Sequence, residues 1–462
     1  MSVISALFDN DKIYNFAHAF NVQDITTPAM KEAILDWFAL YYAAESLKDE
    51  DACQRLPVTI VSKLTKTAFS EYSATADDQK PFVVAVLDAL NNARKKAMQQ
   101  ALIGGECFLK PVFERDGRVS FGVVGRQNYS VLGRNSRDEI TDIGTSERTV
   151  YNGKFYTLLE RRSVDHAGYL TIRSKLYRSD SEQYLGVEVP LTTLEQYAAI
   201  VPENRLPSPV RSIGMVPLRT PLENCVDGSA DAVSVYAPAV GLLHNINRNE
   251  AQMNTEFSNA ESRIMASRDM FRADERGWMA LKDHVFTTFD DDPKEIGITI
   301  FSPNIREQSF LARKTEYLRN IETLIGLKRG ILSEVEAAER TATEVTSSAG
   351  DYNLTIIDFQ QMWENAVREA VRVCDVLGRM YKAQTGAAVD PEKDVVIDWG
   401  NGILYDEEKE WSNYMALVSA GMLKPEIALA WKFNMPWDTP EDLQKIREKY
   451  MPEINALEGG EE

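Results

Sequence analysis

The chain has 462 residues, 44% of them hydrophobic, and carries a formal net charge of −19 at pH 7. This length predicts more than one small hydrophobic core, and the composition is ordinary for a soluble globular protein. The acidity argues against a protein that grips nucleic acid tightly, because such a protein needs a basic face against the phosphates. Either nucleic acid is not a partner, or the contact with it is weak and sliding.

The sequence has no segment typical of membrane insertion or export. No apolar run reaches the roughly 18 to 20 residues that a membrane-spanning helix needs. Asp9 and Asp11 interrupt the region where a signal peptide would have its apolar core, so we expect no export. The cysteines form no C-x-x-C pair and are typical of reduced, mostly buried thiols in a cytosolic protein; they are Cys53, Cys107, Cys225 and Cys374.

Three helices are predicted at the start of the chain. Thr27 and Pro28 have the pattern of an N-cap and a first helical residue, and the apolar stripe after them continues to about Glu50. A second helix follows Pro57, and a third covers residues 78–102. We interpret all three as core helices.

A β meander is predicted next, because the apolar period changes to two after Gly104-Gly105. Asp116-Gly117 and Asn152-Gly153 are signals of type I′ hairpin turns. Proline-rich residues 201–221 are predicted to form an extended connection, since proline fits neither a helix interior nor a central strand. The predicted strands are residues 107–113, 118–124, 156–164, 169–177 and 185–189.

A long helix and a small insert follow. Residues 230–268 form a helical segment with a thin apolar stripe, which one domain would bury poorly, so we expect contact with neighbouring subunits. Residues 269–304 form an insert with one strand at 296–300, below the roughly 40 residues that an independent core needs. Its aromatic residues are therefore expected to pack against copies of the insert or another protein.

From Arg306 the pattern is a helix, a polar break and a longer helix. The first helix has an apolar stripe between dense charges of both signs. The break begins at Gly330, and Thr341 with Glu344 has capping-box spacing, so the second helix is predicted to start at Thr341. That helix is partly apolar all round, which is typical of a central buried helix, and Gly386 is predicted to end it.

The C-terminal part is predicted to contain a short strand and three short helices. The final residues, 458–462, are acidic and glycine-rich and are predicted to be disordered. The strand is placed at residues 395–399 and the helices at 406–419, 425–433 and 439–450.

No catalytic, cofactor or metal site is predicted. The sequence has no P-loop, no G-x-S-x-G elbow and no H-E-x-x-H, and its histidines are far apart. Gly400-Asn-Gly402 begins like a dinucleotide fingerprint, but Tyr405 stands where the third glycine is needed. The carboxylates of residues 290–292 could hold a divalent cation, although a solvated turn is the favoured reading. We therefore expect neither enzymatic activity nor a cofactor.

Several stretches resemble, in the same order, the bacteriophage portal proteins of long-tailed (siphophage-type) double-stranded DNA phages. The most specific stretch is residues 306–345, which end in Arg340-Thr-Ala-Thr-Glu-Val345; the family usually has Lys where Arg340 stands. Ala101-Leu-Ile-Gly104-Gly105-Glu106 resembles the helix-to-sheet entry of the family's wing region. The resemblance covers nearly the whole chain.

The resemblance implies an α+β, mainly helical fold, the phage portal fold, in which long stem helices bracket a small β-containing clip. The implied regions are the wing (1–229), first stem helix (230–268), clip (269–304), second stem helix (305–332), tunnel loop (333–346), long wing helix (347–394), and crown with C-terminal tail (395–462).

The resemblance also implies a homo-oligomeric ring of about twelve subunits at one capsid vertex of the virion, assembled in the cytoplasm of a bacterial host. Double-stranded DNA would pass through it during packaging and ejection. The implied protein partners are the terminase large subunit, a head–tail adaptor, and the major capsid and scaffolding proteins, with no membrane. The acidity suits this role, because an acidic wall repels phosphate and lets DNA slide.

Three groups of residues are candidates for these contacts. DNA-facing candidates in the tunnel loop and its flank are Lys328, Arg329, Ser333, Glu334, Glu336, Glu339, Arg340 and Thr341. Subunit-interface candidates on the stem are Arg306, Arg313, Lys314, Arg319 and Glu322. Candidates for partner contacts in the clip are Phe271, Trp278, Phe286 and Phe289. For the three basic residues Lys328, Arg329 and Arg340, solvated or intersubunit-paired side chains are the favoured interpretation, and transient contact with phosphate is the other.

Two other functional classes stay open on the sequence alone. One is a different head–tail structural protein of the virion, such as an adaptor. Adaptors are usually small, so the length of this chain argues against an adaptor. The other is an enzyme of nucleic-acid metabolism, against which the missing phosphate loop, metal cluster and nucleophile argue.

Overall fold

The computed structural model describes residues 16–43, 52–77, 79–114, 118–260, 304–333, 342–400 and 407–451, apart from 78, 434, 436 and 438, and the backbone of four short strands between 263 and 301. The chain divides into two compact units. The first comprises residues 1–68 and 74–396, and the second comprises Phe69–Ser73 with residues 397–462. Strands β1 (Ser73–Ala76) and β15 (Val395–Asp398) lie where the chain passes from one unit to the other.

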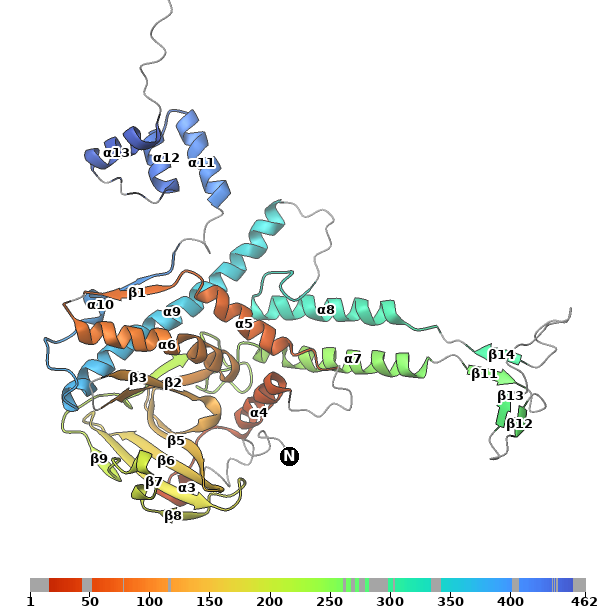
Figure 1. Ribbon diagram of the computed structural model, residues 1–462, viewed down its shortest axis with the longest axis horizontal. Coiled ribbons are helices and arrows are strands. Elements are labelled where there is room, and N and C mark those ends of the chain that lie inside the picture. Colours follow the sequence, from red (N-terminus) through yellow and green to blue (C-terminus); the bar gives the residue numbers. More distant parts are fainter. Residues whose placement is uncertain are drawn as a thin grey trace, which may run out of the picture. The chain divides into compact units, whose positions relative to one another are not determined.

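The predicted N-terminal core helices are present, after a short helix α3 (Phe16–Phe20). Helix α4 (Pro28–Tyr42) begins as expected, because the Thr27 side chain accepts a 3.2 Å hydrogen bond from the Met30 amide. It ends earlier than predicted, since Ala43 adopts a left-handed conformation with φ of 51°. Helices α5 and α6 span Leu56–Ala68 and Pro81–Gly104 (Figure 1).

A three-stranded antiparallel sheet follows α6, in the order β10-β2-β3. Its strands are β2 (Glu106–Phe113), β3 (Val119–Gly125) and β10 (Val216–Arg219). The proline-rich connection therefore contributes a strand, but at the edge, where Pro217 costs no internal ladder bond. Gly105, with φ of 83°, makes the turn into β2; a Cβ there would lie 2.5 Å from the Ala232 carbonyl oxygen.

The predicted meander is a second sheet in the order β4-β5-β6-β7-β8, with β9 also paired to β7. Asn152 and Gly153 have φ of 50° and 72°, as a type I′ turn between β5 and β6 requires. A core of Phe108, Tyr129, Val131, Ile143, Ile213 and Met215 packs inside this part of the unit. The strands are β4 (Tyr129–Arg134), β5 (Ile140–Tyr151), β6 (Lys154–Val164), β7 (Leu170–Ser179), β8 (Val187–Val189) and β9 (Glu203–Arg205).

The helix predicted at residues 230–268 is shorter than expected. Helix α7 spans Val240–Asn259, and a 3-10 turn at Ala237–Ala239 precedes it. Pro238 explains the late start, because its ring and missing amide do not allow an unbroken α-helix upstream. The end of the predicted helix is instead strand β11 (Arg263–Ala266).

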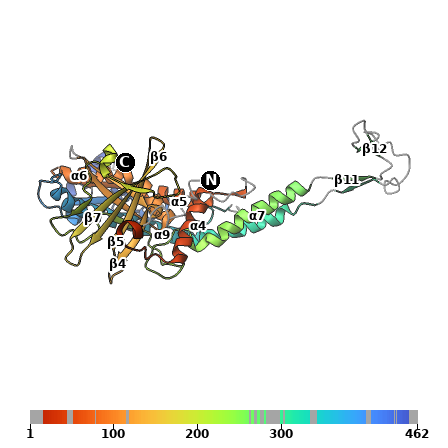
Figure 2. The ribbon, with the colours of Figure 1, turned by 90° about the horizontal axis from the view of Figure 1, so that it is seen from below.

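The insert that follows contains more strand than the sequence indicated. Strand β11 pairs with β14 (Ile298–Phe301), and β12 (Phe271–Ala273) pairs with β13 (Met279–Leu281). Helix α8 (Glu307–Ile325) then runs antiparallel to α7, and the two lie side by side in Figures 1 and 2.

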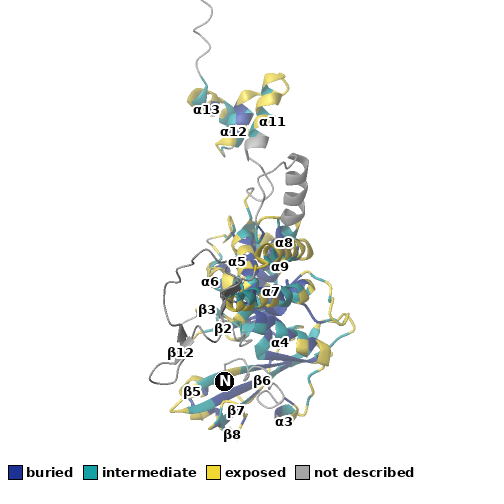
Figure 3. Ribbon diagram, turned by 90° about the vertical axis from the view of Figure 1, so that its right-hand side faces the viewer, coloured by how far each residue is buried: buried dark blue, intermediate teal, exposed yellow. Residues whose placement is uncertain are grey.

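The second long helix, α9, spans Ala342–Met380, one residue from its predicted start. It is the predicted central buried helix, because one row of its side chains is inaccessible: Ile356, Phe359, Trp363, Val367, Ala370, Val371, Cys374 and Leu377. It ends six residues before Gly386, where Lys382 adopts φ of 60°. A short helix α10 (Pro391–Asp394) follows. Buried residues are dark blue in Figure 3.

The second unit contains the three short helices predicted near the C-terminus. They are α11 (Glu407–Ser419), α12 (Pro425–Lys432) and α13 (Pro440–Tyr450). Arg447 of α13 forms a 2.7 Å ion pair with Glu426, whose side chain is 6% exposed. The acidic end of the chain, residues 452–462, lies outside the described residues.

Candidate functional site

Helices α7 and α8 are joined by polar contacts spaced along their length. Arg306 makes a bidentate ion pair with Glu256, with N–O distances of 2.6 and 3.1 Å. The Asn249 side chain donates a 3.2 Å hydrogen bond to the Phe310 carbonyl. Lys314 lies 2.8 Å from Glu250, whose side chain is 7% exposed. These contacts fix the register of the two helices within one chain.

The same helices leave apolar side chains in solvent. Phe257 on α7 is 42% exposed, and Leu311 and Leu324 on α8 are 44% and 49% exposed. Figure 3 shows how much of the α8 surface is exposed. Arg319 is exposed as well, and its side chain has no partner among the described residues. The pair therefore presents a mixed apolar and charged surface that the other described residues do not cover.

The five stem residues predicted from the sequence occupy three different environments. Arg306 and Lys314 bind acidic residues of α7 in the same chain, although the Arg306 side chain stays 73% exposed. Arg313 is 52% exposed, pairs with Glu316 at 2.7 Å, and lies 4.4 Å from the Tyr317 ring centroid. Arg313 and Arg319 thus both lie at the surface of the chain.

Glu322 is not available to a neighbour, because its side chain is completely buried. One carboxylate oxygen accepts hydrogen bonds from the Gly330, Leu332 and Ser333 amides at 3.1, 2.6 and 2.9 Å. The other accepts from the Ser333 hydroxyl at 2.8 Å. The structure therefore places Glu322 inside the chain, as the acceptor for the turn that follows α8, and not on a surface that another subunit can reach.

Three of the predicted DNA-facing residues are described. Lys328 is half-buried and Arg329 is exposed, and neither side chain has a partner among the described residues. Ser333 is 7% exposed and bound to Glu322. The remaining loop candidates, Glu334, Glu336, Glu339, Arg340 and Thr341, lie outside the described residues.

The predicted clip contacts are almost entirely outside the described residues. The backbone of Phe271 begins strand β12, and its side chain is not described. Trp278, Phe286 and Phe289 lie outside the described residues, as does the acidic run 290–292.

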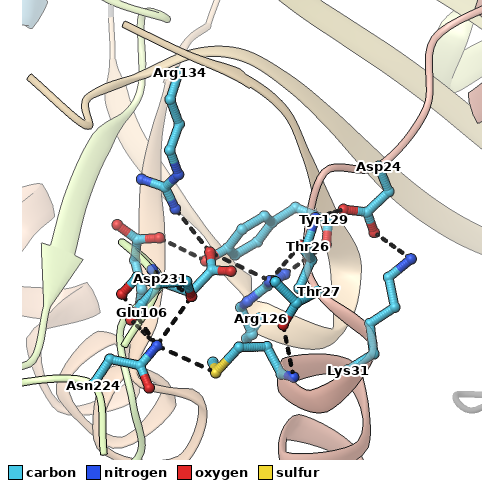
Figure 4. Close-up of polar contacts among 12 residues, drawn as sticks. Asp24, Thr26, Thr27, Lys31, Glu106, Arg126, Tyr129, Arg134, Asn224 and Asp231 are labelled. Carbon is cyan, nitrogen blue, oxygen red and sulfur yellow. Dashed lines mark hydrogen bonds and ion pairs between the residues drawn. The ribbon is translucent and has the colours of Figure 1, made fainter. Parts of the chain in front are cut away.

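A buried polar cluster lies where α4, the start of β4 and residues 224–231 meet (Figure 4). Asp231 lies 2.7 Å from Arg134 and 3.9 Å from Arg126, and all three side chains are at most 12% exposed. Arg126 also donates to the Thr26 hydroxyl at 3.1 Å and to the Tyr129 carbonyl at 3.2 Å. These bonds tie the segment before α7 to the residues that lead into α4 and to the meander.

Glu106 belongs to the same cluster and accepts a 2.8 Å hydrogen bond from the Tyr129 hydroxyl. Burial raises the pKa of Glu106, and the opposing effects of Tyr129 and the nearby arginines do not fully offset it. Burial also raises the pKa of Tyr129. Burial in this cluster therefore disfavours the ionised forms of both side chains.

A cleft of about 900 Å³ opens beside this cluster. Its lining carries both signs of charge and includes Arg134, Arg211, Arg219, Glu106 and Glu369. In the described part of the chain, no group of three or more His, Cys, Asp or Glu residues is placed to hold a metal ion. No described helix is long and apolar enough to cross a membrane.

The cysteines are free thiols, as predicted, but less buried than expected. Cys107 and Cys374 are buried, and burial raises the pKa of each thiol. Cys53 is half-buried, and Cys225 is exposed because it lies in the loop that carries Asn224 and Asp227 at the surface.

Sequence reasoning missed two of these features. Glu322 stands in the apolar row formed by Leu318, Ile321 and Ile325, and a carboxylate in such a row was the available signal that it binds something inside the chain. The pairing of Arg126 and Arg134 with Asp231 had no signal, because nothing in the sequence relates residues so far apart.

The comparison with known protein families gives one match, to the model described as phage portal protein, SPP1 Gp6-like, over residues 67–451. The comparison with curated proteins found no relative. Among solved structures, one similar chain comes from a structure described as the neck of a native GTA particle computed with C12 symmetry. It is 13% identical, with a TM-score of 0.42, over 91% of this chain and 98% of the other. Because the family model covers most of the sequence, including helices α7, α8 and α9, this chain belongs to the SPP1 Gp6-like family of phage portal proteins.

Proposed function

We propose that the chain forms a closed ring at one vertex of a phage capsid, through which double-stranded DNA enters and leaves. The observation that carries this proposal is the family match over residues 67–451. In this role the terminase large subunit and then a head–tail adaptor dock on the ring, which also contacts the major capsid and scaffolding proteins. The role is structural and requires no catalysis.

The regions of the chain divide this work. Helices α7 and α8 are the stem, with the strands β11 to β14 as the clip between them. Helix α9 is the long wing helix, and α11 to α13 form the crown. The exposed apolar side chains of α7 and α8 support the stem assignment, since a ring needs a heterologous interface that closes on itself.

DNA would meet the ring at residues 328–341. Lys328 and Arg329 support this assignment, because both side chains are basic and neither has a partner among the described residues. The acidic remainder of the chain, with a net charge of −19, would keep such contacts brief.

Oligomeric state tests the ring. Size-exclusion chromatography with light scattering, followed by negative-stain imaging, is expected to give a ring with a central hole. A monomer or dimer under every salt condition would contradict the proposal. If a variant that no longer forms rings still packages DNA, a different head–tail structural role is favoured.

The loop assignment has its own test. Deleting Glu334 to Glu339 is expected to leave rings intact and to block DNA packaging into particles assembled with the variant. A matched control is a deletion of equal length from the C-terminal residues 457–462. Packaging at normal efficiency by the loop deletion would remove the proposed role of these residues.

A further inference from the structure

The carboxylate of Glu322 holds the turn that leaves α8. Its two oxygens accept four hydrogen bonds, three from the backbone amides of Gly330, Leu332 and Ser333 and one from the Ser333 hydroxyl. The side chain is 0% exposed, and Ser333 is 7% exposed. Residues 330–333 are therefore wrapped around one acidic side chain.

This arrangement is unfavourable for stability unless the bonds are made. Burying a carboxylate costs free energy, and no cation pairs with Glu322 among the described residues. Glu322 also lies in the last turn of α8, where the helix dipole disfavours negative charge. Amides that converge on one oxygen form an anion-binding nest, and among the described residues they and the Ser333 hydroxyl supply the compensation. The conformation of residues 330–333 and the burial of this charge thus depend on each other.

The end of α8 beneath this turn is itself fixed. The Leu327 amide donates a 2.8 Å hydrogen bond to the Glu322 carbonyl, and Gly326 closes the helix with φ of 72°. A Cβ at Gly326 would lie 2.5 Å from Oγ1 of Thr355, so the helix end touches α9 with no room for a side chain. Glu322 therefore binds the turn to a platform made of α8 and α9.

We infer that Glu322 is a positioning residue, whose carboxylate fixes the place and direction in which the chain leaves α8 toward residues 334–341. This inference rests on the proposed function of those residues in DNA passage. Ser333 is the last residue that Glu322 holds and directly precedes them. Without the carboxylate, residues 330–333 keep their sequence but lose every side-chain bond that defines their path.

Hydrogen–deuterium exchange on assembled rings directly tests the contact between the Glu322 carboxylate and residues 330–333. In Glu322→Ala, we expect amide exchange in peptides spanning residues 327–334 to become about tenfold faster or more, because the Gly330, Leu332 and Ser333 amides each lose a bond to a charged acceptor. Glu322→Gln is expected to fall between wild type and Glu322→Ala, since its amide oxygen can still accept. The matched control is Glu316→Ala on the exposed side of α8, which should leave this exchange unchanged.

DNA packaging separates positioning from stability alone. We expect Glu322→Ala to assemble rings and to package less DNA, with partial rescue by Glu322→Gln. If Glu322→Ala does not assemble, Glu322→Gln and Ser333→Ala carry the comparison, because each removes only part of the bonding. Unchanged exchange at residues 327–334 in Glu322→Ala would show that the carboxylate does not hold this turn. Faster exchange with normal packaging would overturn the positioning role. Normal packaging by the deletion of residues 334–339 would instead defeat the proposed function, while the exchange result would still stand.

Discussion

Lys110 on β2 lies 2.9 Å from a carboxylate oxygen of Glu160 on β6, so this ion pair joins the three-stranded sheet to the meander. Arg162 donates to the same oxygen at 2.7 Å, and the Glu160 side chain is 8% exposed. Burial alone would raise the pKa of Glu160, but the two cations outweigh it and lower the pKa to about 2.

This pair predicts a specific loss of stability in acid. Because the folded-state pKa of Glu160 is lowered, its contribution is fully present above its ordinary pKa of 4.5 and is lost as the pH falls toward about 2. Glu160→Gln should lower the unfolding free energy at pH 7 by on the order of 3 kcal/mol and should remove this acid dependence.

Urea unfolding at pH 7 and at several values between pH 4.5 and 2 measures the effect. The control is Glu203→Gln, which removes an exposed pair with Arg173 and should cost little. An equal loss in both variants would contradict a special contribution from Glu160.

Glu106 should behave in the opposite way. Burial raises its pKa, so its ionisation in the folded chain costs stability, and this cost grows as the pH rises above the ordinary value of a glutamate. Glu106→Gln keeps an acceptor for the Tyr129 hydroxyl and avoids the buried charge. We expect the variant to be the more stable protein at neutral pH, with a difference that shrinks toward pH 4.5 in thermal unfolding scans. A difference independent of pH would refute this.

Gly326→Ala should destabilise the chain more than an alanine at a glycine of equal conformation. At Gly326 the new methyl would meet Thr355 at 2.5 Å and φ is 72°, whereas at Gly153 φ is also 72° and nothing lies within 4 Å. The left-handed conformation costs about 1 kcal/mol at both sites, and the clash adds a further 1 to 3 kcal/mol at Gly326. Chemical unfolding of the two variants side by side measures the difference, and equal losses would show that α9 gives way freely.

Charge reversal on α8 should weaken assembly more than folding. Arg319→Glu changes a side chain with no partner among the described residues, so its unfolding free energy should stay within about 0.5 kcal/mol of wild type. Arg313→Glu also loses the contacts with Glu316 and Tyr317. Light scattering should show fewer rings for both variants but not for Arg137→Glu, an equal change on the exposed β4–β5 turn. Unchanged oligomerisation would mean that these α8 residues are merely solvated.

Local sequence signals predicted much of the fold, and they failed where a distant residue decides the structure. Asn152-Gly153 determined a hairpin, and the apolar row around Trp363 identified the buried helix, because both depend on neighbours in sequence. The helix predicted at residues 230–268 is longer than α7, because the apolar spacing begins before Pro238 and the α-helix begins only after it. Glu322 stands in the apolar row of α8, which indicates burial, but the amides that bind it come from a turn whose conformation no residue pattern specifies.

The exposed thiol of Cys225 makes each subunit separately countable. Cys107 and Cys374 are buried and Cys53 is half-buried, so a mild thiol-reactive dye should attach first at Cys225 and leave the core intact. In a Cys53→Ser background, a labelled assembly then carries one fluorophore for each copy of the chain. The number of bleaching steps from a single particle would report the copy number without averaging, symmetry or a lattice.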